Sequence, residues 1–186
     1  MMATIGLLIA GTSCSNKPKN ETNSTEQATE KVLEVDSLLA NAEQLTNQAI
    51  VVEGVCTHTC KHGGTKLFLM GSNDQQTIRA EAGELGSFDA KCVNNIVRIK
   101  GVLKEERIDE AYLQRWETEL KEKENKEHGE AGEGGCSTEK NARGETADTP
   151  DARVADFRAK IAKQQAETGK AYLSFYFIEA TDYEIR

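Results

Sequence analysis

The residues of this chain that could hold a metal or perform redox chemistry are concentrated in one short segment. Cys56, His58, Cys60 and His62 alternate with other residues in the run CTHTCKH. Side chains two residues apart on a regular β-strand point to the same side, so the sequence predicts that this row shares one face. Thiolate and imidazole together favour Zn or Cu, with iron less favoured, over Mg or Ca.

The spacing of this row limits how many of its members one ion can bind. Neighbouring same-face residues on a strand lie about 6.6 Å apart, and the outermost pair would lie about 20 Å apart. A tetrahedral site therefore needs a turn or another strand to complete it. The glycines at 63 and 64 predict such a turn, which could bring His62 back. The preferred ligands are His58, Cys60 and His62, then Cys56, with Cys92 or Cys136 able to complete the shell.

Other roles for these cysteines stay open at this point. An extended chain from Cys56 to Cys60 spans about 13 Å, beyond the roughly 7 Å limit between bridged Cα atoms, so that disulfide would require a broken strand. Either residue could instead pair with Cys92 or Cys136. The cysteines could also be buried apolar residues, with solvated histidines. A Cys and His nucleophile would need an orienting group and an oxyanion hole, and the sequence shows neither, so we expect no enzyme; Cys/His-dependent activity is the alternative.

Strands and a helix are expected to position the row. The β-rich runs 49–60 and 66–71 are separated by a glycine turn, which predicts a hairpin. Three further strands are predicted over 76–82, 95–103 and 171–185. Apolar residues at helical spacing predict a short helix over 36–45, with Asp36 as its N-cap.

The region between the fourth and fifth predicted strands is strongly charged. Residues 105–170 hold 17 acids and 12 bases, and so carry most of the net charge of −8. Apolar stripes around Trp116 and Phe157 predict two helices, and Thr149 followed by Pro150 predicts the start of the second. Between them, residues 128–148 contain five glycines, which favours a mobile loop.

The N-terminus has an uncharged run, ATIGLLIAG at 3–11, that is too short to span a bilayer. With the small residues before Cys14, it resembles a bacterial lipoprotein signal peptide, although Gly11 stands where an aliphatic residue is usual. The resemblance implies removal of residues 1–13, acylation of Cys14 with palmitate or a similar chain, and a polar tether over 14–31. It also implies a lipid-anchored protein of the bacterial cell envelope, on the periplasmic side or in the outer membrane.

The order of the predicted strands suggests a known barrel. VVEGV at 51–55 and VRIKGV at 97–102 each end with Gly then Val, and such glycines allow tight barrels to bend. Together with a leading helix and an excursion after strand four, they resemble the OB-fold, a five-stranded Greek-key barrel. The fold class is thus mainly β with a helical insertion (α+β): an OB-fold of residues 32–104 plus 171–186, and a two-helix insertion at 105–170.

The pattern resembles secreted or lipid-anchored bacterial OB-fold proteins, a family with a nucleic-acid-binding label. The expected function is a binding protein that holds a transition metal at the first hairpin, for sensing, delivery or structure. The alternative is a metal-free module that binds an oligosaccharide, a single-stranded nucleic acid or another envelope protein, through a face including Phe68, Tyr172 and Tyr176. The acidic charge argues against nucleic acid, and the acidic insertion could contact an envelope protein.

Overall fold

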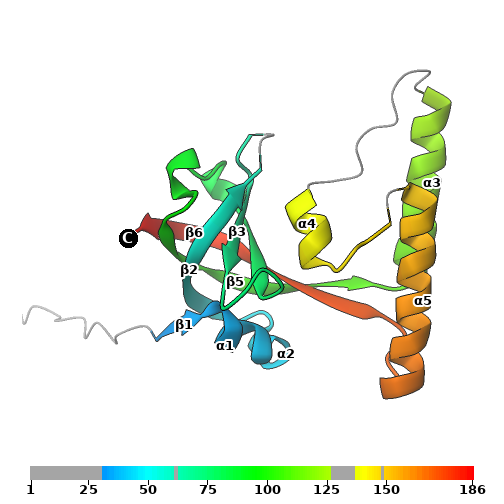
Figure 1. Ribbon diagram of the computed structural model, residues 1–186, viewed down its shortest axis with the longest axis horizontal. Coiled ribbons are helices and arrows are strands. Elements are labelled where there is room, and N and C mark those ends of the chain that lie inside the picture. The colour runs from blue at the N-terminus through cyan, green and yellow to red at the C-terminus, as the bar shows by residue number, and fades with distance from the viewer. Residues whose placement is uncertain (1–30, 61–62, 127–136, 148) are drawn as a thin grey trace, which may run out of the picture. The chain divides into compact units, whose positions relative to one another are not determined.

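The computed structural model describes residues 31–60, 63–126, 137–147 and 149–186 (Figure 1). The predicted signal peptide, the predicted lipidation site Cys14 and almost all of the predicted tether lie outside these ranges. His62, His128 and Cys136 also lie outside them. In the described part of the chain, no helix is both long enough and apolar enough to cross a bilayer.

Five strands close into a barrel, as the sequence predicts. They are β2 (Ala49–Thr59), β3 (Lys66–Met70), β4 (Thr77–Glu81), β5 (Ile96–Ile108) and β6 (Leu173–Ile185). The strands pair in the order β2-β3-β4-β6-β5, and β5 returns to β2. β4 and β6 are parallel, and the other barrel pairs are antiparallel. This connectivity is that of the OB-fold, so the expected fold class is confirmed.

The barrel interior is filled by alternate residues of each strand. Val52, Leu69 and Ile99 are fully buried there, because side chains in a strand point alternately inward and outward. Gly101 lies where the register of β5 and β6 shifts. A Cβ at this position would lie 2.3 Å from the carbonyl oxygen of Glu179, so the barrel wall closes only with glycine there.

An unpredicted strand and two short helices lead into the barrel. β1 (Val32–Glu34) runs parallel to β2. The predicted helix over 36–45 is divided at Asn41 into α1 (Val35–Ala40) and α2 (Ala42–Leu45). The expectation that Asp36 is the N-cap is wrong, since Glu34 holds that position without a side-chain bond. Asp36 instead accepts hydrogen bonds from Ser72 N at 2.8 Å and Ser72 Oγ at 2.5 Å.

The strands β5 and β6 remain paired beyond the barrel, as far as Ile108 opposite Leu173 (Figure 1). Two long helices, α3 (Glu110–Lys126) and α5 (Pro150–Thr168), pack on this ribbon and form a second apolar cluster around Leu113 and Phe157. Both helices were predicted. Thr149 caps α5 as expected, accepting a hydrogen bond from Ala152 N at 3.3 Å.

The connections contain three further short elements. The 3-10 helices η1 (Gly83–Leu85) and η2 (Ala90–Cys92) join β4 to β5. A helix, α4 (Ser137–Ala142), lies inside the segment predicted to be a mobile loop. That prediction is wrong for α4, because charged side chains of this helix contact the barrel, as described below.

Candidate functional site

The Cys and His row does not share one face, because β2 is irregular in the middle of the row. Cys56 pairs with Leu69, whereas His58 pairs with Phe68, so Thr57 is an extra residue in a β-bulge. Cys56 is fully buried in the barrel core, and its thiol donates to the carbonyl of His58 at 3.6 Å. His58 is half-buried on the outer side, with its ring 5.9 Å from that of Phe68. The prediction that Cys56 faces the same way as His58 is therefore wrong.

Beyond the bulge, the strand leads into the predicted turn. Cys60, the residue after β2, donates its N–H to Lys66 O at 2.8 Å, which continues the pairing of β2 with β3. Gly64 N donates to Cys60 O at 3.0 Å, and both Gly63 and Gly64 have positive φ, so the chain folds back here. Over the described ranges, no three His, Cys, Asp or Glu side chains are grouped to hold a metal. The use of His58 and Cys60 as ligands stays a prediction.

Cys92 lies apart from the predicted outer-face ligands. It is fully buried in η2, in the same apolar cluster as Cys56. Burial, and next the charge of Asp89, raise the pKa of the Cys92 thiol. Burial, and next the Cys92 thiol, raise the pKa of Cys56 to about 11. Cys56, Cys60 and Cys92 form no disulfide in the structure, and two of the three are neutral in the core near physiological pH.

The aromatic residues predicted to form a ligand face are only partly brought together. Phe68 is fully buried, and Tyr176 is half-buried against the barrel core. Both line a cavity of about 250 Å³. Tyr172 does not line that cavity, and the guanidinium of Arg107 lies 4.5 Å from its ring centre.

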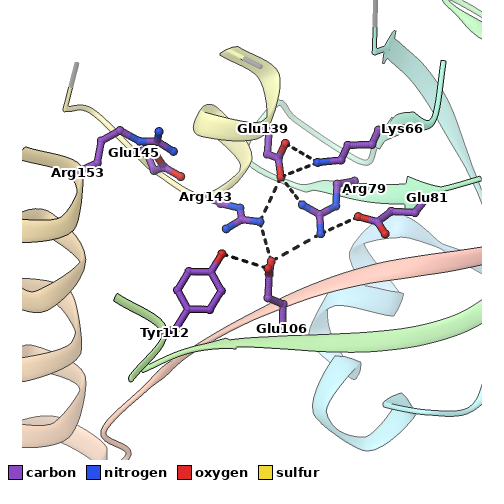
Figure 2. A network of polar contacts seen from close by, with 9 residues as sticks. All are labelled: Lys66, Arg79, Glu81, Glu106, Tyr112, Glu139, Arg143, Glu145 and Arg153. Carbon is purple, nitrogen blue, oxygen red and sulfur yellow. Dashed lines mark hydrogen bonds and ion pairs between the residues drawn. The ribbon is translucent and has the colours of Figure 1, made fainter. Parts of the chain in front are cut away.

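A network of charged side chains from β3, β4, β5 and the α4 segment lies on the outer side of the barrel (Figure 2). The carboxylate of Glu139, from α4, is 3.0 Å from Lys66 Nζ and also accepts from Arg79 Nη1. Arg143 follows one turn later and reaches Glu106 of β5 at 2.6 Å and Glu139 at 3.2 Å. The network therefore joins α4 to three strands of the barrel.

Arg79 is the centre of this network. Besides Glu139, its guanidinium contacts Glu81 at 3.2 Å and Glu106 at 3.7 Å. Only 11% of its side chain is exposed. Its Nε is buried and has no hydrogen-bond partner among the described residues. One donor of the central guanidinium is thus left unused, which is costly for a buried polar group.

Two of the guanidinium groups lie over aromatic rings. Phe68, Arg79 and Phe177 lie opposite one another on neighbouring strands β3, β4 and β6. The Arg79 guanidinium lies 5.0 Å from the ring centre of Phe177, and that of Arg143 lies 5.2 Å from the ring centre of Phe175. These distances are within the range of cation–π attraction.

The ionisation of Glu139 follows from opposing effects. Burial alone would raise the pKa of its carboxyl, but the hydrogen bond from Lys66 and the charges of Arg79, Lys66 and Arg143 outweigh burial and hold the pKa below its usual value. For Arg143, burial alone would lower the pKa of the guanidinium, but the charges of the Glu106 and Glu139 carboxylates outweigh burial and raise the pKa above its usual value. Both groups are therefore charged at physiological pH.

Two cavities adjoin the network, and both are lined by Glu139 and Arg143. The cavity of about 250 Å³ also reaches Phe68 and Thr77 on the barrel. The other, of about 220 Å³, extends to Trp116 and the helices of the insertion. We call the outer surface of β3, β4 and β6 that carries Lys66, Phe68, Arg79, Glu81, Phe175 and Phe177 the barrel face. Glu106 of β5 lies at its edge, and α4 covers it.

Sequence reasoning missed most of this network. The predicted strand over 76–82 assigns no role to Arg79, and Glu139 lies in the segment 128–148, whose glycines predict a mobile loop. The signals that could have found them are local. Glu139 and Arg143 have the spacing of an ion pair on one side of a helix, and Arg79 stands between Ile78 and Ala80 in a strand with one buried side.

The described residues form an OB-fold barrel, and the barrel face, over its second and third strands, carries a partly buried charge network. Comparisons with known proteins add no function. No family model matches the chain, and no curated protein matches it. A crystal structure of a protein assigned as an aspartyl-tRNA synthetase from Leishmania major Friedlin is similar at 14% identity with a TM-score of 0.32, over 47% of this chain and 18% of that one.

Proposed function

We propose that this protein is a lipid-anchored, extracytoplasmic OB-fold module that binds another protein of the cell envelope through the barrel face. The observation that carries the proposal is the charge network on the side where OB-folds bind ligands. Its central guanidinium is nine-tenths covered, is supported by a ring and has an unused donor. The proposed anchor is Cys14, as the resemblance of the N-terminus implies.

The charges of the barrel face favour a protein ligand over a nucleic acid. Lys66 and Arg79 lie beside Glu81 and Glu106, so the surface is mixed in sign. A polyanion that reached the two cations would also meet the two carboxylates, and the chain as a whole carries −8. A protein segment can present charges of both signs in the matching order.

Site-specific cross-linking tests this function. A photoreactive residue at Thr77, which lines the larger cavity, would be placed in the full-length anchored protein and irradiated in envelope membranes. We expect one discrete cross-linked protein, lost with Lys66→Glu plus Arg79→Glu and retained with Lys91→Glu plus Lys163→Glu. The second pair changes the net charge equally at exposed positions. Cross-linking that survives Lys66→Glu plus Arg79→Glu would reject the barrel face as the binding site.

Direct binding to single-stranded DNA tests the competing ligand class. Full-length protein with Cys14→Ser would be titrated into a labelled oligothymidylate at moderate salt, about 0.1 M. We expect no change in anisotropy. Binding that falls steeply as salt rises would instead support a nucleic-acid ligand.

Metal binding at the first hairpin is a second candidate function. The observation in its favour is that His58, on the outer side of β2, and Cys60, directly after the end of that strand, both follow the bulge, and that the turn at Gly63 and Gly64 folds the chain back. With His62, these side chains would supply imidazole and thiolate ligands, which suit Zn or Cu. Cys56 is not part of this candidate site, because it faces the core.

Elemental analysis tests this second candidate. Full-length protein with Cys14→Ser would be incubated with Zn or Cu, freed of excess metal and analysed. We expect about one ion per chain, lost with Cys60→Ala plus His62→Ala and unaffected by Cys56→Ala. Metal content that is unchanged by the first pair, or lost with the second variant, would reject this site.

A further inference from the structure

The helix α4 covers the barrel face in a way that shows what the face can bind. Glu139 projects from α4 to Lys66 and Arg79. Arg143 is the first residue after α4, its N–H still donates to Glu139 O at 3.1 Å, and its side chain reaches Glu106 (Figure 2). We infer that α4 is an internal occupant of the ligand site, and that the site recognises a helical protein segment with an acidic residue followed one turn later by a basic one. This inference deepens the proposed function and rests on it.

The recognition has two parts of opposite sign. The carboxylate of Glu139 is held by Lys66 at 3.0 Å and by Arg79. The guanidinium of Arg143 is held by Glu106 at 2.6 Å. Residues four apart lie on one side of a helix, so both contacts form at once only if the segment is helical and runs in one direction. A segment with the two charges exchanged would place its basic residue beside Lys66 and Arg79, and its acidic residue beside Glu106.

Burial makes these contacts selective. The side chains of Arg79, Arg143 and Glu139 are 11%, 14% and 19% exposed. A charged group that is mostly removed from water is costly to leave unpaired, so a ligand that lacks either charge is disfavoured. The unused Nε of Arg79 adds one more donor that a longer ligand could satisfy.

The attachment of α4 is polar and can therefore be exchanged. Among the described residues, neither apolar cluster of the protein includes a member of α4. The helix has only six residues, too few to be stable alone in water. Its contacts with the barrel face are those of Glu139 and Arg143. The turn that follows is held to α5, where Arg153 contacts Glu145 at 2.5 Å and Lys160 Nζ donates to Gly144 O at 2.7 Å. A partner segment that makes the contacts of Glu139 and Arg143 would therefore compete directly for the barrel face, while the chain stays attached at that turn.

A competing segment from a partner has an advantage that α4 lacks. Phe68 and Thr77 line the cavity beside α4, together with Tyr176. A partner helix longer than α4 could fill this cavity with apolar side chains while repeating the two charge contacts. Effective concentration favours α4, because it belongs to the same chain, so the partner must make such additional contacts to displace it.

The test uses a synthetic peptide of residues 137–147 of this chain as the probe. The receptor is the full-length protein with Cys14→Ser and with Glu139→Ala plus Arg143→Ala, which removes both contacts of its own α4. Titration is followed by amide chemical shifts of the ¹⁵N-labelled receptor. We expect saturable shifts in β3 and β4, and at least about 10-fold weaker binding to the protein that retains Glu139 and Arg143.

Matched peptides and receptors decide the result. A peptide in which the residues at 139 and 143 are exchanged, so that the basic one comes first, keeps the composition and should cause no shifts in β3 and β4. Adding Lys66→Gln to the receptor should also abolish binding, while adding Lys91→Gln should not. The amide spectrum of each receptor shows whether it is folded. If the receptor with Glu139→Ala plus Arg143→Ala is unfolded, a receptor with Glu139→Gln plus Arg143→Gln is used in its place.

The outcomes separate this inference from the proposed function. Absence of shifts in the folded open receptors, or equal binding of the exchanged peptide, would overturn the inference. If the peptide binds as expected but cross-linking at Thr77 does not depend on Lys66 and Arg79, the inference on α4 holds and the proposed envelope-protein function fails.

Discussion

The thiol of Cys56 is expected to be nearly inert in the folded protein. Its side chain is 0% exposed, and burial together with the Cys92 thiol raises its pKa from an ordinary 9.0 to about 11. Because the thiolate is the reactive form, a rise of that size lowers the reactive fraction near neutral pH about 100-fold. Cys60 is partly exposed at the edge of the hairpin and should react far faster.

Single-cysteine variants measure this difference. Full-length chains with Cys14→Ser, Cys92→Ala and Cys136→Ser, and with either Cys60→Ala or Cys56→Ala, would keep Cys56 or Cys60 as the single remaining cysteine. Burial, the larger cause of the raised pKa, is kept in the Cys56 chain. Each chain would be reacted with an aromatic disulfide reagent. We expect the rate at Cys60 to exceed that at Cys56 by about 100-fold or more in the native protein, and the two rates to become similar in denaturant. Similar rates in the native protein would refute the bulge that turns Cys56 into the core.

The same shift makes stability depend on alkaline pH. The pKa of Cys56 is higher in the folded protein than in the unfolded chain, so the neutral thiol favours folding fully below about pH 9. This contribution is lost as the pH rises towards 11, with an upper limit of about 2.7 kcal/mol. The free energy of unfolding should therefore fall over this window, and by less in Cys56→Ala. Identical slopes in both proteins would contradict the assignment.

Other substitutions test the fold and the network. Gly101→Ala should lower the free energy of unfolding by about 3 kcal/mol, because its Cβ meets backbone atoms, whereas Gly86→Ala, in open space with positive φ, should cost about 1 kcal/mol in the same denaturation assay. Phe157→Ala should cost about 3 kcal/mol, read by fluorescence of the single tryptophan. Thr149→Ala should cost about 1 kcal/mol by loss of the α5 cap. Because the pKa of Glu139 is lowered, its contacts stabilise α4 above about pH 4.3 and are lost in more acidic solution, where amide exchange in α4 should accelerate; unchanged exchange would show that α4 is held by other contacts.

The barrel was predictable because its signals are local and repeated. Runs rich in β-forming residues, some of them alternating, predict all five of its strands, and the glycines at 54 and 101 indicate the bends. The structure supplies the reason for both: a Cβ at Gly54 would lie 2.8 Å from Val35 Cγ2, and one at Gly101 would meet the backbone of β6. The lengths of the strands were less predictable. β5 continues through polar residues to Ile108, because β6 and the second apolar cluster lie beside it.

The candidate site was predictable only in part, because it depends on contacts that are distant in the sequence. The regular alternation assumed for Cys56 and His58 fails at one extra residue, and no residue type around Thr57 signals a bulge. The helix α4 has almost no apolar residues, so its pattern resembles a loop. Its contacts with the barrel are made with Lys66 and Arg79, which lie 73 and 60 residues before Glu139. Pairing over such sequence distances is not visible in local periodicity.

The shared ribbon of β5 and β6 has a consequence for how the chain folds. Closure of the barrel requires two strands that lie far apart in the sequence to find each other, and searches of that kind are slow. The helices α3 and α5 follow and precede those strands directly, and their apolar sides pack together near the outer end of the ribbon. Once this helical pair has formed, Ile108 and Leu173 already lie side by side. Pairing of β5 with β6 can then proceed from this end towards the barrel one residue at a time, and each step closes only a short loop.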